Sequence, residues 1–252
     1  MSALIDAGWV ITVALIAGRL AGVFLLVPVL GFSVLPPMVR VMFVLLLALA
    51  LASAPGIGPY RGDVSSIGLT LAMGMEFLLG AALAFGLHAA MAAFSFGGQL
   101  LDFQVGFSAA ALFDPNTQVQ SPLMSVTLGL LGSVAFLTLD AHHELIRGLV
   151  LSFQQMPPGH AALPTDVGPL IAQFGLVFVY GLVLVSPAIL GLMLVDIAVA
   201  VTARTMPQIN VYFIALPLKV FVGLLLLAIS LAHLGPLLRR IMASIFSYWQ
   251  TL

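Results

Sequence analysis

Residues 170–234 read LIAQFGLVFVYGLVLVSPAILGLMLVDIAVAVTARTMPQINVYFIALPLKVFVGLLLLAISLAHL. Two apolar stretches, about 170–203 and 211–234, lie on either side of the polar residues 204–210. Each stretch is longer than the roughly 20 residues that a helix needs to cross a bilayer. Pro207 interrupts a helix, because proline lacks the backbone N–H and clashes with the preceding turn. The sequence here therefore predicts two membrane helices joined by a turn.

The rest of the chain has the same apolar character. Of its 252 residues, 62% are hydrophobic and 7% are charged, whereas roughly 25% are charged in soluble domains. So few polar groups cannot cover a soluble protein, and we expect lipid or another apolar protein around most of the surface. The apolar stretches are about 9–30, 38–54, 67–94, 122–139, 170–203 and 211–234. We predict an all-α membrane protein with about six apolar segments, in a single domain over residues 1–252.

Prolines inside apolar stretches predict interruptions in the membrane helices. Pro28 lies in the first stretch and Pro187 in the fifth, so we expect broken helical hairpins as readily as straight spans. Residues 1–9 contain no Lys or Arg and lack the basic region of a cleaved signal peptide. We therefore expect the first apolar segment to be retained.

Charge and composition exclude several classes of function. The formal net charge is −1, and the charged residues are scattered singly without a basic stripe, which excludes nucleic-acid binding. The chain has no Cys, which excludes disulfides, thiol catalysis and thiolate metal sites. It has neither the nucleophile motif of serine hydrolases nor a phosphate-binding glycine loop. We expect neither catalysis nor a cofactor.

The stretch 95–121 differs from the rest of the chain. It mixes glycines and polar side chains with several phenylalanines. This is too polar for contact with lipid and too aromatic for a solvent-exposed loop. Such a segment is usually buried in protein or lines a water-filled cavity.

Isolated charges lie inside the apolar stretches, among them Asp196. A charge at the centre of a bilayer costs at least about 2.5 kcal/mol, so it usually faces a partner or a cavity. Snorkelling from a helix end is the alternative for Arg19 and Lys219, but the Glu76 side chain is too short to reach far. The candidate intramembrane polar or subunit contacts are Arg19, Glu76, Asp102, Arg204, Gln208, Asn210 and Lys219.

A polar cluster follows the fourth apolar stretch. His143 and Glu144 come three and four residues after Asp140, which places them on one helical face together. With His142 they resemble a metal site, but zinc needs three or four ligands with supporting partners. We prefer a polar helix end at a membrane interface, with Arg147 paired to His143 or Glu144, and assign no metal.

In order and spacing, these motifs resemble the FliR family of flagellar biosynthesis proteins and its type III secretion counterparts. The resemblance spans nearly the whole chain. It is carried by Arg19 with Pro28, Pro36 with Arg40, Glu76 with Gly80, Gln99 with Asp102, residues 104–108 leading to Asp114 and Pro115, Asp140 with His142 and His143, residues 204–210, and Pro217 with Leu218.

The resemblance implies a non-enzymatic subunit of a helically arranged, hetero-oligomeric export gate that flagellum assembly requires. The partners it implies are two smaller membrane proteins in multiple copies, FliP-like and FliQ-like, an FlhB-like export switch protein, and unfolded flagellar substrates. The location it implies is the bacterial inner membrane at the flagellar basal body, with the protein either multi-pass or displaced toward the periplasm.

The resemblance also implies a plug that closes the export channel. We hypothesise that Gly97, Gly98 and Gly106 let the matching segment fold into the channel, where its phenylalanines obstruct the passage. The plug residues implied are Gln104, Gly106, Phe107, Ser108, Phe113, Asp114 and Pro115.

Three alternatives stay open. Virulence type III secretion gates have related subunits, although residues 204–210 and 106–115 look closer to the flagellar branch. A small secondary transporter also has broken helices with isolated charges, but it predicts matched interruptions in two inverted halves. An intramembrane enzyme needs a nucleophile or paired carboxylates, and Glu76 and Asp102 cannot be paired from sequence alone.

Overall fold

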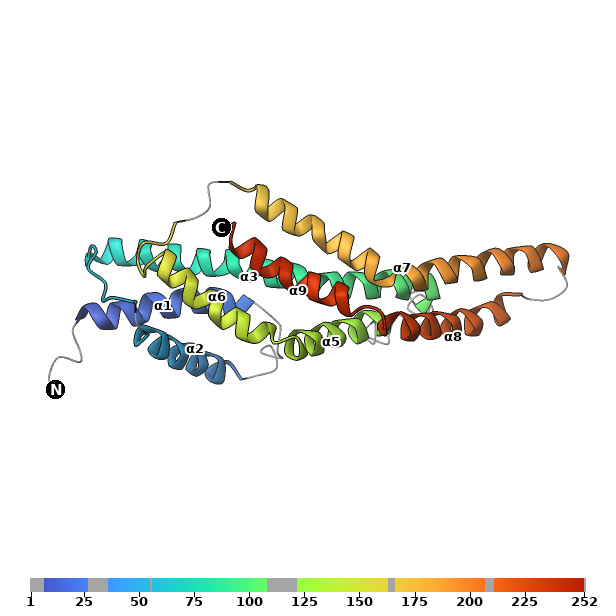
Figure 1. Ribbon diagram of the computed structural model, residues 1–252, viewed down its shortest axis with the longest axis horizontal. Coiled ribbons are helices and arrows are strands. Elements are labelled where there is room, and N and C mark those ends of the chain that lie inside the picture. Colours follow the sequence, from blue (N-terminus) through green and yellow to red (C-terminus); the bar gives the residue numbers. More distant parts are fainter. Residues whose placement is uncertain are drawn as a thin grey trace. The chain divides into compact units, whose positions relative to one another are not determined.

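The computed structural model describes residues 7–26, 36–54, 56–107, 122–162, 166–206 and 211–251. Within these ranges the regular structure is helical, without a strand (Figure 1). The helices are α1 (Ala7–Leu26), α2 (Pro37–Ala52), α3 (Ser66–Val105), α5 (Leu123–Thr138), α6 (Ala141–Gln155), α7 (Gly168–Thr205), α8 (Val211–Leu231) and α9 (Gly235–Trp249). The prediction of an all-α protein is confirmed.

Helices α1, α3, α7 and α8 are long and apolar enough to cross a membrane, and α5 with α6 passes the same test as one broken span. Within a bilayer no water can pair with the backbone, so an apolar stretch must satisfy its own N–H and C=O groups as a helix. Each of the six predicted apolar stretches contains one helix. The predicted segments are therefore confirmed as helical elements.

The chain divides into two compact units. Unit 1 comprises Met1–His88, Asp140–Gln173 and Ser244–Leu252, and unit 2 comprises Ala89–Leu139 and Phe174–Ala243. The core of unit 1 includes Leu15, Leu20, Leu79, Leu149 and Phe153, and that of unit 2 includes Phe94, Leu101, Phe136, Leu184 and Leu192. That the whole chain acts as one membrane domain stays a prediction.

Two helices, α6 and α9, were not among the predicted segments. On α6, Ala141, Leu145, Leu149 and Phe153 recur every four residues and are buried. This spacing is that of an amphipathic helix, whose polar face interrupts the apolar sequence. A search for continuous apolar stretches misses such helices for that reason.

Helix α3 extends beyond the predicted end of its apolar stretch at residue 94, and Gly97 and Gly98 lie inside it. A Cβ added at Gly97 would lie 2.8 Å from the carbonyl oxygen of Gly181, and one at Gly98 would collide with the backbone of Ser125. The hypothesis that these two glycines belong to a folding loop is therefore wrong. They instead let α7 and α5 approach α3 closely.

Helix α7 continues through Pro187, and its ribbon bends part-way along its course (Figure 1). Proline cannot donate to the carbonyl four residues before it, which belongs to Val183. The Ser186 hydroxyl donates to that carbonyl instead, with an Oγ–O distance of 3.0 Å. The helix thus stays continuous at this interruption, while Pro28 lies outside the described residues.

Helices α7 and α8 lie side by side within unit 2 (Figure 1). A Cβ added at Gly223 of α8 would contact the Leu192 side chain of α7 at 3.5 Å. In the other direction, Gly191 leaves room for the Leu226 side chain. The predicted pair of membrane helices is confirmed, and the turn residues 207–210 lie outside the described residues.

Candidate functional site

The candidate site lies in unit 2, where the chain on either side of residues 108–121 comes together. We call residues 95–107, which comprise the end of α3 and the two residues after it, and residues 122–125, which comprise Pro122 and the start of α5, the neck. Asp102 is buried there, with 1% of its surface exposed. Its Oδ1 accepts a hydrogen bond from the Met124 N–H and its Oδ2 accepts one from the Ser125 N–H, each at 3.0 Å.

These bonds supply α5 with a cap. The first N–H groups of a helix have no partner inside the helix. Helix α5 follows Pro122 and has no side-chain cap of its own. A carboxylate suits the position because the helix start carries partial positive charge. Asp102 therefore caps α5 from α3 and joins the two sides of the neck.

A second set of contacts holds the same two helices together. The Ser125 hydroxyl donates to the Ser95 carbonyl with an Oγ–O distance of 3.0 Å. Gly98 faces the backbone of Met124 and Ser125 so closely that any added side chain would collide with it. The close packing of α3 against α5 at the neck therefore requires glycine at position 98.

Gly106 ends α3. Its N–H donates to the Asp102 carbonyl at 3.2 Å, and its φ is 95°, in the region that favours glycine. A Cβ at this position would also lie 3.1 Å from Leu216 Cδ1 of α8. Phe107 follows and is half-buried. Three of the predicted plug residues therefore lie at the neck, Gln104 within α3 and Gly106 and Phe107 directly after it.

A polar triad connects the neck to α7 and α8. Gln104 Nε2 donates to Asp196 Oδ2 at 3.0 Å, and Lys219 Nζ forms an ion pair with Asp196 Oδ1. The two carboxylate oxygens thus bind different partners. Lys219, a predicted polar contact, and Gln104, a predicted plug residue, both meet Asp196. The Asp196 carboxylate neutralises the charge of Lys219 and accepts a hydrogen bond from Gln104.

A separate buried network lies in unit 1. Arg19 and Glu76 are both fully buried, and Arg19 Nε lies 2.6 Å from Glu76 Oε2. The Arg19 guanidinium also donates to Ser152 Oγ at 2.8 Å and to the carbonyl oxygen of Met156 at 2.9 Å. Glu76 Oε1 accepts the Gly159 N–H at 2.8 Å. Arg19 therefore does not snorkel, and Glu76 meets Arg19 and not Asp102.

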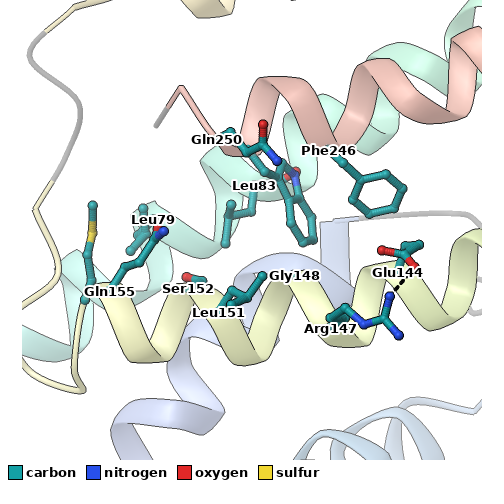
Figure 2. Close-up of a pocket in the computed structure, with 12 residues that line it drawn as sticks. Leu79, Leu83, Glu144, Arg147, Gly148, Leu151, Ser152, Gln155, Phe246 and Gln250 are labelled. Carbon is teal, nitrogen blue, oxygen red and sulfur yellow. Dashed lines mark hydrogen bonds and ion pairs between the residues drawn. The ribbon is translucent and has the colours of Figure 1, made fainter.

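The remaining predicted residues are dispersed. Arg204 is exposed in the last turn of α7, where a cation suits the negative end of the helix. Glu144 and Arg147 pair as predicted, with Oε1 and Nη1 2.6 Å apart (Figure 2). Asp140 lies at the start of α6. The predicted residues outside the described ranges are Ser108, Phe113, Asp114, Pro115, Gln208 and Asn210.

Unit 1 also contains a cavity of about 130 Å³ between α3, α6 and the end of α9 (Figure 2). Leu79, Leu83, Leu151 and Phe246 contribute apolar walls. This is room for a few water molecules. Among its lining residues, no nucleophile is hydrogen-bonded to a base, so the cavity does not indicate catalysis.

Sequence reasoning missed the partners of the charged residues. Nothing local links Asp102 to Met124 or Arg19 to Ser152, because these residues are distant in sequence and meet only through packing. One signal was present in the sequence. Helix α5 starts after Pro122 without Ser, Thr, Asp or Asn at its cap position, which leaves its first N–H groups in need of a distant acceptor.

The model of the family described as bacterial export proteins, family 1, matches residues 10–245. The chain belongs to this family. The match includes the described neck, the polar triad and the Arg19–Glu76 pair. It confirms the resemblance inferred from the motifs.

Individual relatives agree with the family. The flagellar biosynthetic protein FliR of Bacillus subtilis (strain 168) is 30% identical over 228 residues, 88% of this chain and 87% of the relative. FliR of Caulobacter vibrioides is 29% identical over 238 residues, 93% of this chain and 94% of the relative. The Yop proteins translocation protein T of Yersinia pestis is 27% identical over 223 residues, 87% of this chain and 85% of the relative. Together with its apolar helices, family membership identifies the chain as a multi-pass membrane protein.

Proposed function

We propose that this chain is a non-enzymatic subunit of a flagellar type III protein export gate. It forms the channel with two smaller membrane proteins, FliP-like and FliQ-like, and plugs that channel when it is closed. Its place is the bacterial inner membrane at the flagellar basal body, beside an FlhB-like switch protein. Unfolded flagellar proteins pass through the gate it forms. Family membership and the similarity to flagellar biosynthetic proteins support this assignment.

The observation that carries the plug is the geometry of the neck. Asp102 and Gly98 hold the end of α3 against the start of α5. The described chain is therefore held together on either side of residues 108–121. This fixed attachment supports a plug whose carrying helices stay in place when the channel opens. Closure by steric obstruction also suits a passage that must admit many different sequences while retaining ions.

The exposed surface of unit 2 supports assembly with other membrane proteins. Large apolar side chains on α7 and α8 are exposed, and contiguous apolar surface marks contact with lipid or with partner subunits. They include Phe178, Leu182, Leu190, Leu194, Ile197, Phe213, Ile214, Phe221 and Leu225. A gate built from several apolar subunits would cover much of this surface.

The second candidate is a virulence type III secretion gate. The match to the Yersinia translocation protein favours it, at 27% identity over 87% of this chain. The flagellar relatives match at 30% and 29% over similar lengths. The two candidates differ in the substrates exported, so restoring motility to a cell that lacks its own FliR separates them.

Replacing residues 108–115 with an equally long Gly and Ser segment tests the plug. We expect the gate still to copurify with its smaller membrane partners, because the neck is unchanged. We expect ion leakage across the membrane to rise several-fold, followed with a membrane-potential dye in cells producing the gate. Unchanged leakage with an intact complex would rule out the plug, and solute transport by the isolated chain in liposomes would favour the transporter.

A milder variant tests the role of Gln104 in the same closure. Gln104→Leu removes the hydrogen bond to Asp196 but leaves the Lys219 ion pair in place. A hydrogen bond to a charged group contributes about 1.5–3 kcal/mol, which shifts an equilibrium by about 10- to 150-fold, and we expect leakage to rise by up to a factor in this range. The matched control is Gln99→Leu, because Gln99 is exposed on the same helix. Equal leakage in both variants would exclude Gln104 from the closure.

A further inference from the structure

A cluster at the start of α6, in unit 1, has no part in the proposed plug. Asp140, His142 and His143 each offer one ligand atom, and these three atoms lie within 4.8 Å of one another. Asp140 Oδ1 and His143 Nδ1 are 3.4 Å apart. Two ligands placed about 2.1 Å from one tetrahedral zinc ion are also separated by about 3.4 Å. This pair already has the spacing that a shared ion requires.

The Asp140 carboxylate does not cap the first N–H groups of α6, as an acid at a helix start commonly does. Asp140 occupies the cap position of α6, but its side chain accepts no hydrogen bond from the helix. It faces His143 instead. Its φ of 56° is in the left-handed region, which residues other than glycine seldom adopt. The carboxylate is therefore directed toward His143 and is not used to cap the helix.

His142 adds a third donor that has no other partner. Its Nδ1 is buried and makes no hydrogen bond within the described part of the chain, whereas buried polar groups are normally paired. The two imidazole rings lie 4.1 Å apart between centroids.

Glu144, the other acid nearby, is used elsewhere. Its Oε1 lies 2.6 Å from Arg147 Nη1 at the edge of the cavity in Figure 2. The donor set of the cluster is therefore two imidazoles and one carboxylate. Zinc and other divalent transition metals accept this combination and keep a further position for water or another ligand.

We propose that Asp140, His142 and His143 bind one divalent transition-metal ion, and that zinc is the ion bound. The ion connects the left-handed residue before α6 to the first turn of that helix. Binding requires the three ligand atoms, which lie within 4.8 Å of one another, to move slightly closer together. The side chains of Asp140 and His143 are free to do so because they are 75% and 67% exposed. The ion stabilises the start of α6 within unit 1 and takes no part in a reaction.

Zinc binding to the detergent-solubilised protein, purified with its partners and without a polyhistidine tag, tests this proposal. We expect one zinc ion per copy of this chain by metal analysis, with a dissociation constant in the micromolar range or below by calorimetry. At a free zinc concentration 100 times that constant, the unfolding equilibrium should shift by about 100-fold, which raises the Tm.

Two substitutions identify the ligands. Asp140→Asn and His143→Gln are both at exposed positions and should leave the fold intact, while each lowers zinc affinity by about 100-fold. The matched control is His88→Gln, an exposed histidine on α3 that should bind zinc as the wild type does. Millimolar affinity in the wild type, or equal affinity in Asp140→Asn and His88→Gln, would overturn the proposal.

Discussion

Arg19 is a buried charged residue with several different contacts in unit 1. It is fully buried, its Cζ lies 4.2 Å from the centre of the Phe153 ring, and its N–H groups bind Glu76 and carbonyl oxygens at the end of α6. A guanidinium has five N–H donors in one rigid plane, whereas a lysine ammonium has three donors and no planar fork. The side chain therefore joins α1, α3 and α6 within unit 1.

Removing one member of this pair should destabilise the protein strongly. Arg19→Met leaves the Glu76 carboxylate buried without its partner, which typically costs about 3–5 kcal/mol. We expect a large fall in the Tm of the solubilised protein. The double variant Arg19→Met, Glu76→Leu should recover part of the loss, because no unpaired charge remains buried.

Arg61→Met is the control for this pair, since Arg61 is exposed in the connection between α2 and α3. Its Tm should stay close to that of the wild type. If the double variant were less stable than Arg19→Met alone, the charge pair would not be the cause of the effect.

At the scale of elements, close helix contacts depend on glycine. Gly22 of α1 and Gly80 of α3 face each other's backbone in unit 1, and Gly98 faces α5 in unit 2. A methyl group at these positions would meet backbone atoms, which cannot rotate away. The glycines of α3 therefore determine how closely its neighbouring helices can pack against it.

Gly98→Ala should separate α3 from α5 and weaken the cap that Asp102 provides. We expect less complex to copurify with the partner proteins and a lower Tm for what remains. Gly74→Ala on the same helix is the matched control, because an added Cβ there meets nothing within 4 Å. That change should be neutral or stabilise α3 by up to about 1 kcal/mol. Equal copurification of both variants would contradict the proposed role of Gly98.

Prediction of the elements succeeded where the chain is continuously apolar. The six stretches became helices because a membrane leaves the backbone no other partner. The same reasoning missed α6, whose apolar residues recur every four positions, and it ended α3 too early. In α3 the glycines were interpreted as loop residues, whereas their local preference is outweighed by the packing of α5 and α7 against them.

At the scale of the whole molecule, the exposed apolar surface determines whether the protein can be extracted from the membrane. We expect the chain to stay in the membrane fraction after washing with alkaline carbonate and to need detergent for extraction. The physical reason is that α1, α3, α7 and α8 are each long and apolar enough to span a bilayer. Release by carbonate in the absence of detergent would contradict a multi-pass protein. The control is a peripheral protein of the same membranes, which carbonate should release.

The sequence by itself determined the helical class, the membrane environment, the family and the identity of the charged residues that need partners. Hydropathy and backbone hydrogen bonding act over one turn or one span, so they can be read locally. Only the tertiary structure decided that Arg19 meets Glu76, that Asp102 caps α5, and that Asp196 joins Gln104 to Lys219. Those pairings depend on how separate helices pack against each other, and no local pattern in the chain encodes that arrangement.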